Sequence, residues 1–159
     1  MPDITIRFAE EKDVPTILRF IRALADYEHM ADEVVADEQR LRDSLFGARR
    51  GAEVLFAVAD GQEVGFALFF HNYSTFLGQP GLYLEDLFVL PEWRGRGCGR
   101  ALLRRLAQLA LERGCGRMEW VCLDWNRPSI DFYRARGAAA LDDWTIYRLT
   151  GETLENMAK

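Results

Sequence analysis

The sequence is poor in the residue types that build metal sites and disulfide frameworks. Its 159 residues include two histidines and three cysteines. Cys98, Cys115 and Cys122 form an odd set without a C-x-x-C pair, and His29 and His71 are not at the spacing of metal ligands. These absences argue against a disulfide framework or a zinc site. We therefore predict that the protein holds no metal.

Long apolar runs and a broad basic face are also absent. No apolar run reaches about eighteen residues, the length of a membrane span, and no apolar segment follows a basic start, as a secretory signal requires. The formal net charge is −5, whereas nucleic-acid-binding domains usually carry a basic face. We expect a soluble, cytoplasmic protein with no membrane and no nucleic-acid partner. The length suits a single domain over residues 1–159.

The hydrophobic periodicity predicts a mixed α/β domain with a central sheet covered by helices. Asp13 is expected to cap the first helix, and Asp60 and Gly61 to form a tight hairpin turn. A loop is expected over residues 74–81. The expected strands are residues 4–8, 53–59, 63–72, 82–90, 117–123 and 144–149. The expected helices are residues 13–27, 37–46, 101–113 and 128–134, with a short helix closing the chain.

A glycine-rich turn at residues 94–99, RGRGCG, joins the apolar strand 82–90 to the amphipathic helix. Such a turn leaves backbone N–H groups unpaired at one spot, and the helix dipole adds positive potential there. Arg94, Arg96 and Arg100 add charge in or beside the turn. The combination predicts a ligand that carries phosphate.

Two common phosphate-binding patterns do not fit this turn. It lacks the Gly-Lys-Ser/Thr of a Walker A loop, and a G-x-G-x-x-G that starts at Gly95 fails because its last position is Arg100. Two other interpretations remain open. In one, the glycines serve only tight packing. In the other, Cys98 is a nucleophile paired with a histidine, its pKa lowered by its place at a helix N-terminus.

The pattern Arg-x-x-Gly-x-Gly, filled by Arg94, Gly97 and Gly99, resembles the pyrophosphate loop of the GNAT superfamily of N-acyltransferases. The resemblance extends over nearly the full length of the chain. Within the superfamily, the chain resembles the diamine/thialysine N-acetyltransferase group in particular. Five blocks carry it, in the order 24–28, 83–86, 94–99, 123–126 and 132–138.

This resemblance implies a GNAT-like central mixed, mostly antiparallel sheet flanked by helices, and acetyl-CoA as co-substrate. It also implies that the main chain of one strand pairs with the pantetheine arm of the cofactor. The cofactor-binding residues that it predicts are Leu87, Phe88, Val89, Arg94, Gly95, Arg96, Gly97, Cys98, Gly99, Arg100, Asn126, Ser129 and Tyr133.

Tyr133 is, by the resemblance, the general acid that protonates the departing thiolate. A thiol and a phenol differ by only about 1.5 pKa units, so the proton transfer is feasible. Tyr133 lies one helical turn after Ser129, on the same expected face. The alternative is an aromatic side chain packed against the core.

Glu85 and Asp86 interrupt an apolar strand, which is costly unless they have a use. Strict alternation would put them on opposite faces. The resemblance makes Glu85 the base that removes the ammonium proton and Asp86 a contact of the amine substrate, together with Tyr27 and Glu28. The alternatives are ion pairs with neighbouring arginines and, for Glu28, an ordinary surface position.

The predicted substrate is a primary amine of a small molecule. Polyamine-type members carry an aspartate in the loop before the long strand, where residues 74–77 read STFL. We therefore favour a thialysine-like amino acid over a polyamine, and expect a homodimer from the resemblance. An acyl-CoA-binding regulatory module without turnover, and acetylation of protein amino groups, are the competing hypotheses.

Overall fold

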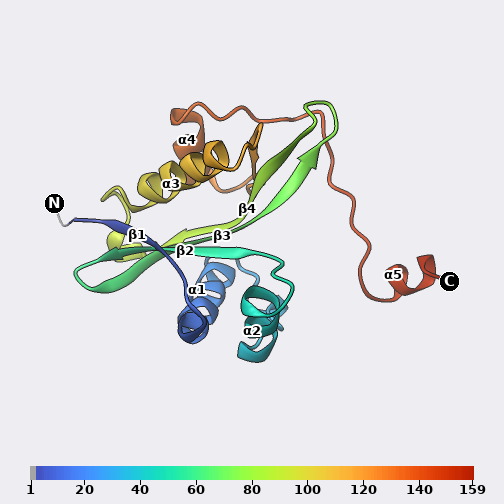
Figure 1. Ribbon diagram of the computed structural model, residues 1–159, viewed down its shortest axis with the longest axis horizontal. Helices are drawn as coiled ribbons and strands as arrows, with labels where there is room; N and C mark the ends of the chain where they lie inside the picture. The colour runs from blue at the N-terminus through green and yellow to red at the C-terminus, as the bar shows by residue number, and fades with distance from the viewer. Residues whose placement is uncertain (1–2) are drawn as a thin grey trace. The chain divides into compact units, whose positions relative to one another are not determined.

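The computed structural model describes residues 3–159, in two compact units that are each described by themselves. The first unit runs up to Val121 and holds a five-stranded sheet with the strand order β1-β2-β3-β4-β5 (Figure 1). The strands are β1 Thr5–Phe8, β2 Glu53–Ala59, β3 Gln62–Ser74, β4 Gln79–Val89 and β5 Met118–Glu119. The first four pair antiparallel and β5 pairs parallel to β4. The predicted mixed, mostly antiparallel sheet is confirmed; the single domain stays a prediction.

Helices cover both faces of this sheet. The first unit contains α1 Val14–Tyr27, α2 Glu38–Phe46 and α3 Cys98–Glu112. Two of them, α1 and α2, lie on one face, and α3 crosses the other (Figure 1). Short 3-10 turns occur at Glu11–Asp13, Ala31–Glu33 and Pro91–Trp93.

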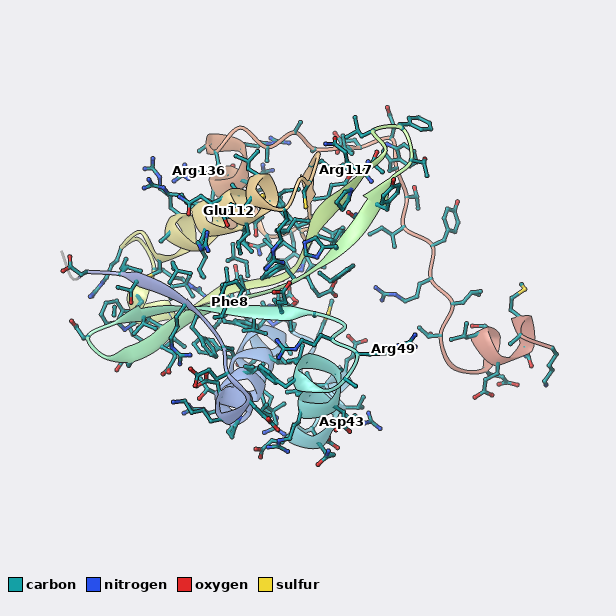
Figure 2. The ribbon with its side chains drawn as sticks, viewed as in Figure 1. Phe8, Asp43, Arg49, Glu112, Arg117 and Arg136 are labelled. Atoms are coloured by element: carbon teal, nitrogen blue, oxygen red, sulfur yellow. The ribbon has the colours of Figure 1, made fainter. Side chains whose placement is uncertain are left out.

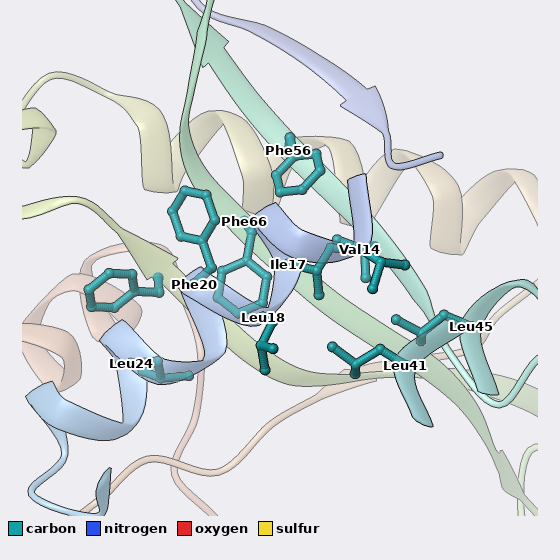
Figure 3. Close-up of a cluster of buried hydrophobic side chains, with 11 residues drawn as sticks. Val14, Ile17, Leu18, Phe20, Leu24, Leu41, Leu45, Phe56 and Phe66 are labelled. Atoms are coloured by element: carbon teal, nitrogen blue, oxygen red, sulfur yellow. The ribbon is translucent and has the colours of Figure 1, made fainter. Parts of the chain in front are cut away.

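The main core lies between α1, α2 and the sheet. Leucine, valine and isoleucine of the helices meet phenylalanines of the strands there (Figure 3). Phe20 of α1 stacks on Phe66 of β3 at 5.2 Å between ring centroids and meets Phe56 of β2 at 5.9 Å. Burial of such rings is the main source of stability in a domain of this size. The apolar face of α1, predicted from its periodicity, is confirmed.

The predicted ends of the two strands around residues 74–81 are wrong. The loop expected at 74–81 is a tight turn, because β3 continues to Ser74 and β4 already begins at Gln79. The Leu77 amide donates to the Ser74 hydroxyl at 3.2 Å, and Gly78 has a φ of 65°. Side-chain capping and one left-handed glycine thus close the hairpin without a longer loop.

Asp13 precedes α1 as predicted, but its carboxylate does not cap that helix. It accepts from the Arg7 guanidinium at 2.8 Å and from the Glu10 amide at 2.7 Å. The Arg7 contact is the main reason that the pKa of Asp13 falls below its usual value. Arg7 also pairs with Glu63 at 2.8 Å, so this network ties β1 to β3 and to the start of α1.

The second unit, Cys122–Lys159, holds α4 Arg127–Ala135 and α5 Gly151–Met157. The strand predicted at 144–149 is not formed, and the one predicted at 117–123 is reduced to Met118–Glu119 of the first unit. Trp144 is 80% exposed and Tyr147 is 91% exposed. Alternation of apolar residues permits a strand, but a strand also needs a neighbouring edge to pair with.

Candidate functional site

The predicted glycine turn connects β4 to α3 and has the conformation that glycine permits. Gly95 has a φ of 75° and Gly97 a φ of 91°, in the left-handed region that side chains with a Cβ avoid. Buried Trp93 anchors the start of the turn, and the Arg96 guanidinium lies over its ring at 4.9 Å. Two features therefore hold the turn in place: the left-handed conformation of its glycines and the packing of Trp93 with Arg96.

Backbone donors accumulate at this turn. The first hydrogen bond of α3 runs from the Ala101 amide to the Gly97 carbonyl at 2.9 Å. Within residues 3–159, the amides of residues 95–100 donate to no backbone carbonyl outside the helices and strands, and no side chain caps α3. Free amides at a helix N-terminus form a site for an anion. The arrangement fits the diphosphate of a nucleotide cofactor.

Arg94 points from the turn toward the end of α1. Its Nε donates to the Val89 carbonyl at 3.0 Å, and its guanidinium lies 4.8 Å from the Tyr27 ring and 5.2 Å from the Phe88 ring. The contact joins the predicted cofactor turn to Tyr27, a predicted substrate residue. A direct contact of Arg94 with the cofactor stays a prediction.

β4 has an open edge next to the turn. On one side, Leu87, Phe88 and Val89 pair with β3. On the other side, β5 pairs with β4 only at Leu82 and Tyr83 within the first unit. The backbone groups on that side of residues 84–89 therefore have no neighbouring strand there, and an extended ligand with amide groups can pair with them.

A β-bulge interrupts β4 at its two acidic residues. Leu84 faces Phe69 and Asp86 faces Leu68, which leaves Glu85 without a partner in the register. The expectation that alternation separates Glu85 and Asp86 onto opposite faces does not hold here, because a bulge breaks the period of two. The sequence shows that two acidic residues interrupt the strand, but it does not show that a bulge forms at them.

Glu28, Glu85 and Asp86 lie close enough to interact. Asp86 is partly buried, and its pKa is raised to about 7 by that burial and then by the charges of Glu85 and Glu28. Burial also raises the pKa of Glu28, at the C-terminal end of α1. No ion pair of residues 3–159 includes any of the three carboxylates, so the alternative of arginine pairing is not observed. Glu28 and Asp86 are desolvated in part, Glu85 beside them is exposed, and a site that gathers carboxylates in this way is suited to receive a cation.

The remaining predicted residues belong to the second unit. Asn126 is buried and its side chain accepts from the Ser129 amide at 3.4 Å, so it caps the N-terminus of α4. Tyr133 follows Ser129 by four residues on α4, and its ring meets Phe132 edge to face at 5.7 Å. The predicted cofactor contacts of Asn126, Ser129 and Tyr133, and the role of Tyr133 as acid, stay predictions.

The nucleophile hypothesis for Cys98 is not supported. Its side chain is 1% exposed, and burial raises the pKa of its thiol, with only partial compensation from Arg96. A reactive thiol needs exposure and a lowered pKa. Cys98 instead packs beneath the first turn of α3.

Two other kinds of feature are absent from residues 3–159. They contain no group of three or more histidine, cysteine, aspartate or glutamate side chains placed to hold a metal ion. None of their helices has the length and apolar character needed to cross a bilayer.

Comparison with known proteins identifies the class to which this fold and site belong. Residues 18–138 match the model of the acetyltransferase (GNAT) family, and the chain belongs to that family. It is an N-acetyltransferase, similar to thialysine N-epsilon-acetyltransferase from Bos taurus at 38% identity over 99% of both chains. It is also similar to L-ornithine N5-acetyltransferase NATA1 from Arabidopsis thaliana, at 31% identity over 97% of this chain and 87% of that one.

The fold has neighbours among solved structures. An integron cassette protein from the mobile metagenome of V. cholerae superimposes with a TM-score of 0.82, at 27% identity over 98% of both chains. The predicted family and fold are thereby confirmed, and the regulatory module without turnover is set aside.

Proposed function

We propose that the protein transfers the acetyl group of acetyl-CoA to a primary amine of a small molecule, by direct attack in a ternary complex. One observation carries the proposal. A single stretch of chain presents, in order, the carboxylates at the bulge, the open edge of β4 and the free amides of residues 95–100. These features suit an ammonium, an amide-bearing arm and a diphosphate, respectively.

Acetyl-CoA would supply an activated thioester carbonyl, and the amine must lose a proton before it can attack. For an amine with a pKa near 10.4, freeing the lone pair at pH 7 costs about 4–5 kcal/mol. Glu85 and Asp86 accept this proton as a pair, either directly or through water. Asp86 sets the pH of the transfer, because its pKa is raised to about 7 by burial and by the neighbouring acids.

Tyr133 completes the proposed chemistry as the general acid. The amine would attack the thioester carbonyl directly, so no acyl-enzyme would form. Tyr133 would donate its phenol proton to the departing thiolate and regain a proton from solvent. The support is the family resemblance of the block that contains Tyr133 and its place one turn after Ser129 on α4.

The names of two relatives suggest the chemical class of the amine acceptor. One relative is named for thialysine and the other for ornithine, and both compounds are amino acids with a primary amine on the side chain. We infer an acceptor of that kind, which Glu28 and the carboxylates at the bulge attract by charge.

A thiol-release assay tests the proposal. The purified protein is mixed with acetyl-CoA and one amine at a time, with thialysine, ornithine, spermidine and a short lysine peptide in the panel. We expect release that depends on a small amino acid amine. Release only with the peptide would instead support acetylation of protein amino groups, and release with none would overturn the proposed acceptor class.

We also infer a homodimer. Exposed apolar side chains recur within residues 141–149, including Leu141, Trp144, Ile146, Tyr147 and Leu149. Their alternation suits a strand whose partner edge comes from a second copy. Sedimentation velocity tests this: we expect a dimer in the natural sequence and a monomer in Ile146→Asp. A natural sequence that sediments as a monomer would overturn the inference.

A further inference from the structure

The sheet face that holds α1 and α2 continues beyond these helices along the β3–β4 hairpin (Figure 1). The core on this face includes Phe66 and Leu68 of β3 but does not extend to Phe70, the next residue on the same face. Phe70 lies opposite Tyr83 of β4 in the register, with 5.0 Å between the ring centroids. Both side chains are only partly buried. The hairpin therefore offers an aromatic surface next to the carboxylates at the bulge.

An ion pair lies beside this aromatic surface. Glu119 of β5 is opposite Tyr83 in the register, and its Oε1 lies 3.0 Å from Nε of Arg117. Arg117, labelled beside the hairpin in Figure 2, also donates from Nη2 to the Tyr73 carbonyl at 3.4 Å. The Asn72 amide donates to Oε1 of Glu119 at 3.4 Å. These contacts from β3 hold the two charged side chains in place.

The ion pair still has a donor and an acceptor to offer to a ligand. Within residues 3–159, Oε2 of Glu119 receives no hydrogen bond and Nη1 of Arg117 donates none. The Arg117 and Glu119 side chains are 39% and 32% exposed, so a ligand can reach both. A guanidinium binds a carboxylate, and a carboxylate accepts from an ammonium. The pair is therefore complementary to a ligand that carries both charges on one carbon atom.

Tyr83 connects this ion pair to the carboxylates at the bulge. Burial raises the pKa of the Tyr83 phenol, and the charges of Glu85 and Glu119 raise it further, as expected for a phenol near both carboxylates. Along β4, Tyr83 and Asp86 are three residues apart with the bulge between them, a span of roughly 7–10 Å. That span suits an extended amino-acid side chain with an amine at its end.

We propose that Arg117 and Glu119 bind the α-carboxylate and the α-ammonium of the acceptor amino acid, while its side-chain amine lies at the carboxylates of the bulge. The inference rests on the proposed function and names the residues that distinguish an amino acid from a diamine. Phe70 and Tyr83 contact the apolar chain between the two ends. A diamine of the same length has no carboxylate for Arg117, so it loses a contact that the amino acid makes.

Steady-state kinetics with thialysine and with its decarboxylated diamine test the proposal, because the two amines differ only in the α-carboxylate. We expect kcat/KM to favour thialysine about five- to tenfold, since the contact is charge-assisted but partly screened by solvent. Arg117→Gln should remove this preference by raising KM for thialysine, with kcat kept and the diamine unaffected. Glu119→Gln should raise KM for both amines, because both carry the second ammonium.

Arg113→Gln is the matched control, because the Arg113 side chain is 32% exposed and also pairs with a glutamate, Glu53, at 2.6 Å. It should keep the preference for thialysine. Calorimetry with coenzyme A should give the same affinity for every variant, which shows that each is folded. Equal kcat/KM for the two amines in the natural protein, or a preference that survives in Arg117→Gln, would overturn the subsite while the proposed function stands. If the natural protein acetylates neither amine, the proposed function itself fails.

Discussion

The two units of this chain use apolar side chains in opposite ways. Up to Val121, phenylalanines and leucines of the sheet are enclosed by α1, α2 and α3, and Phe56 and Phe66 have no exposed area. From Cys122 onward, large apolar side chains such as Trp144, Ile146 and Tyr147 are more than half exposed. The same kind of sequence pattern therefore builds a core in one region, whereas in the other it leaves the apolar side chains exposed.

Truncation of matched aromatic residues gives the largest expected contrast. Phe66→Ala removes a fully buried ring from the contact with Phe20 and should lower the free energy of unfolding by about 3–5 kcal/mol. Trp144→Ala removes an 80% exposed ring and should change it by less than about 0.5 kcal/mol. Urea unfolding below the concentration of any self-association measures both. A large loss in Trp144→Ala would mean that the second unit does bury this side chain in solution.

Asp86 gives the next contrast, because its stability effect depends on pH. Its pKa in the folded protein, about 7, lies above the ordinary 3.8. Folding therefore favours the protonated form, and stability is retained below about pH 4 and lost as pH rises through 7. Asp86→Asn removes that loss. Its advantage over the natural protein should grow from nearly zero at pH 4 to roughly 3–4 kcal/mol at pH 8.

Asp124→Asn is the control from the second unit, where the side chain is exposed. It should change the free energy of unfolding by less than about 0.5 kcal/mol at either pH. Urea denaturation at pH 4 and pH 8 provides the measurement. If Asp86→Asn has the same advantage at both values, the carboxylate is not desolvated as described.

The contrast between the units also explains how far the sequence could be interpreted. The hairpin at Asp60 and Gly61, the helix of residues 98–112 and the glycine turn follow from local rules, because turn glycines and an amphipathic period can be recognised in the residues of one segment. The bulge at Glu85 depends on the register between β4 and β3, and register is a property of two strands. The strand expected at 144–149 failed for the same reason, because its pattern contains no information about the edge that it would join.

Tyr133→Phe tests whether the second unit supplies chemistry. Loss of the phenol proton should lower kcat about a hundredfold, in line with general acid catalysis, and leave the affinity for coenzyme A unchanged. Tyr73→Phe removes a hydroxyl from an exposed position of β3 and should leave kcat unchanged. Steady-state kinetics and calorimetry measure the two quantities. Normal turnover in Tyr133→Phe would remove this residue from the proposed mechanism and confine the chemistry to the first unit.

Gly97→Ala has a smaller expected effect on stability than Phe66→Ala, and it separates the anion site from plain helix geometry. The added Cβ would meet only Ile4, at 3.9 Å, so the cost comes from the φ of 91° and should be about 1–2 kcal/mol. Gly114, with a φ of 71°, lies at the other end of α3 and has open space around it. Gly114→Ala should therefore lose a similar amount of stability, measured by urea denaturation. Only Gly97→Ala should also weaken the binding of coenzyme A in calorimetry, because only that substitution shifts the amides of residues 95–100. Equal binding by the two variants would show that the turn does not need its left-handed glycine to hold the diphosphate.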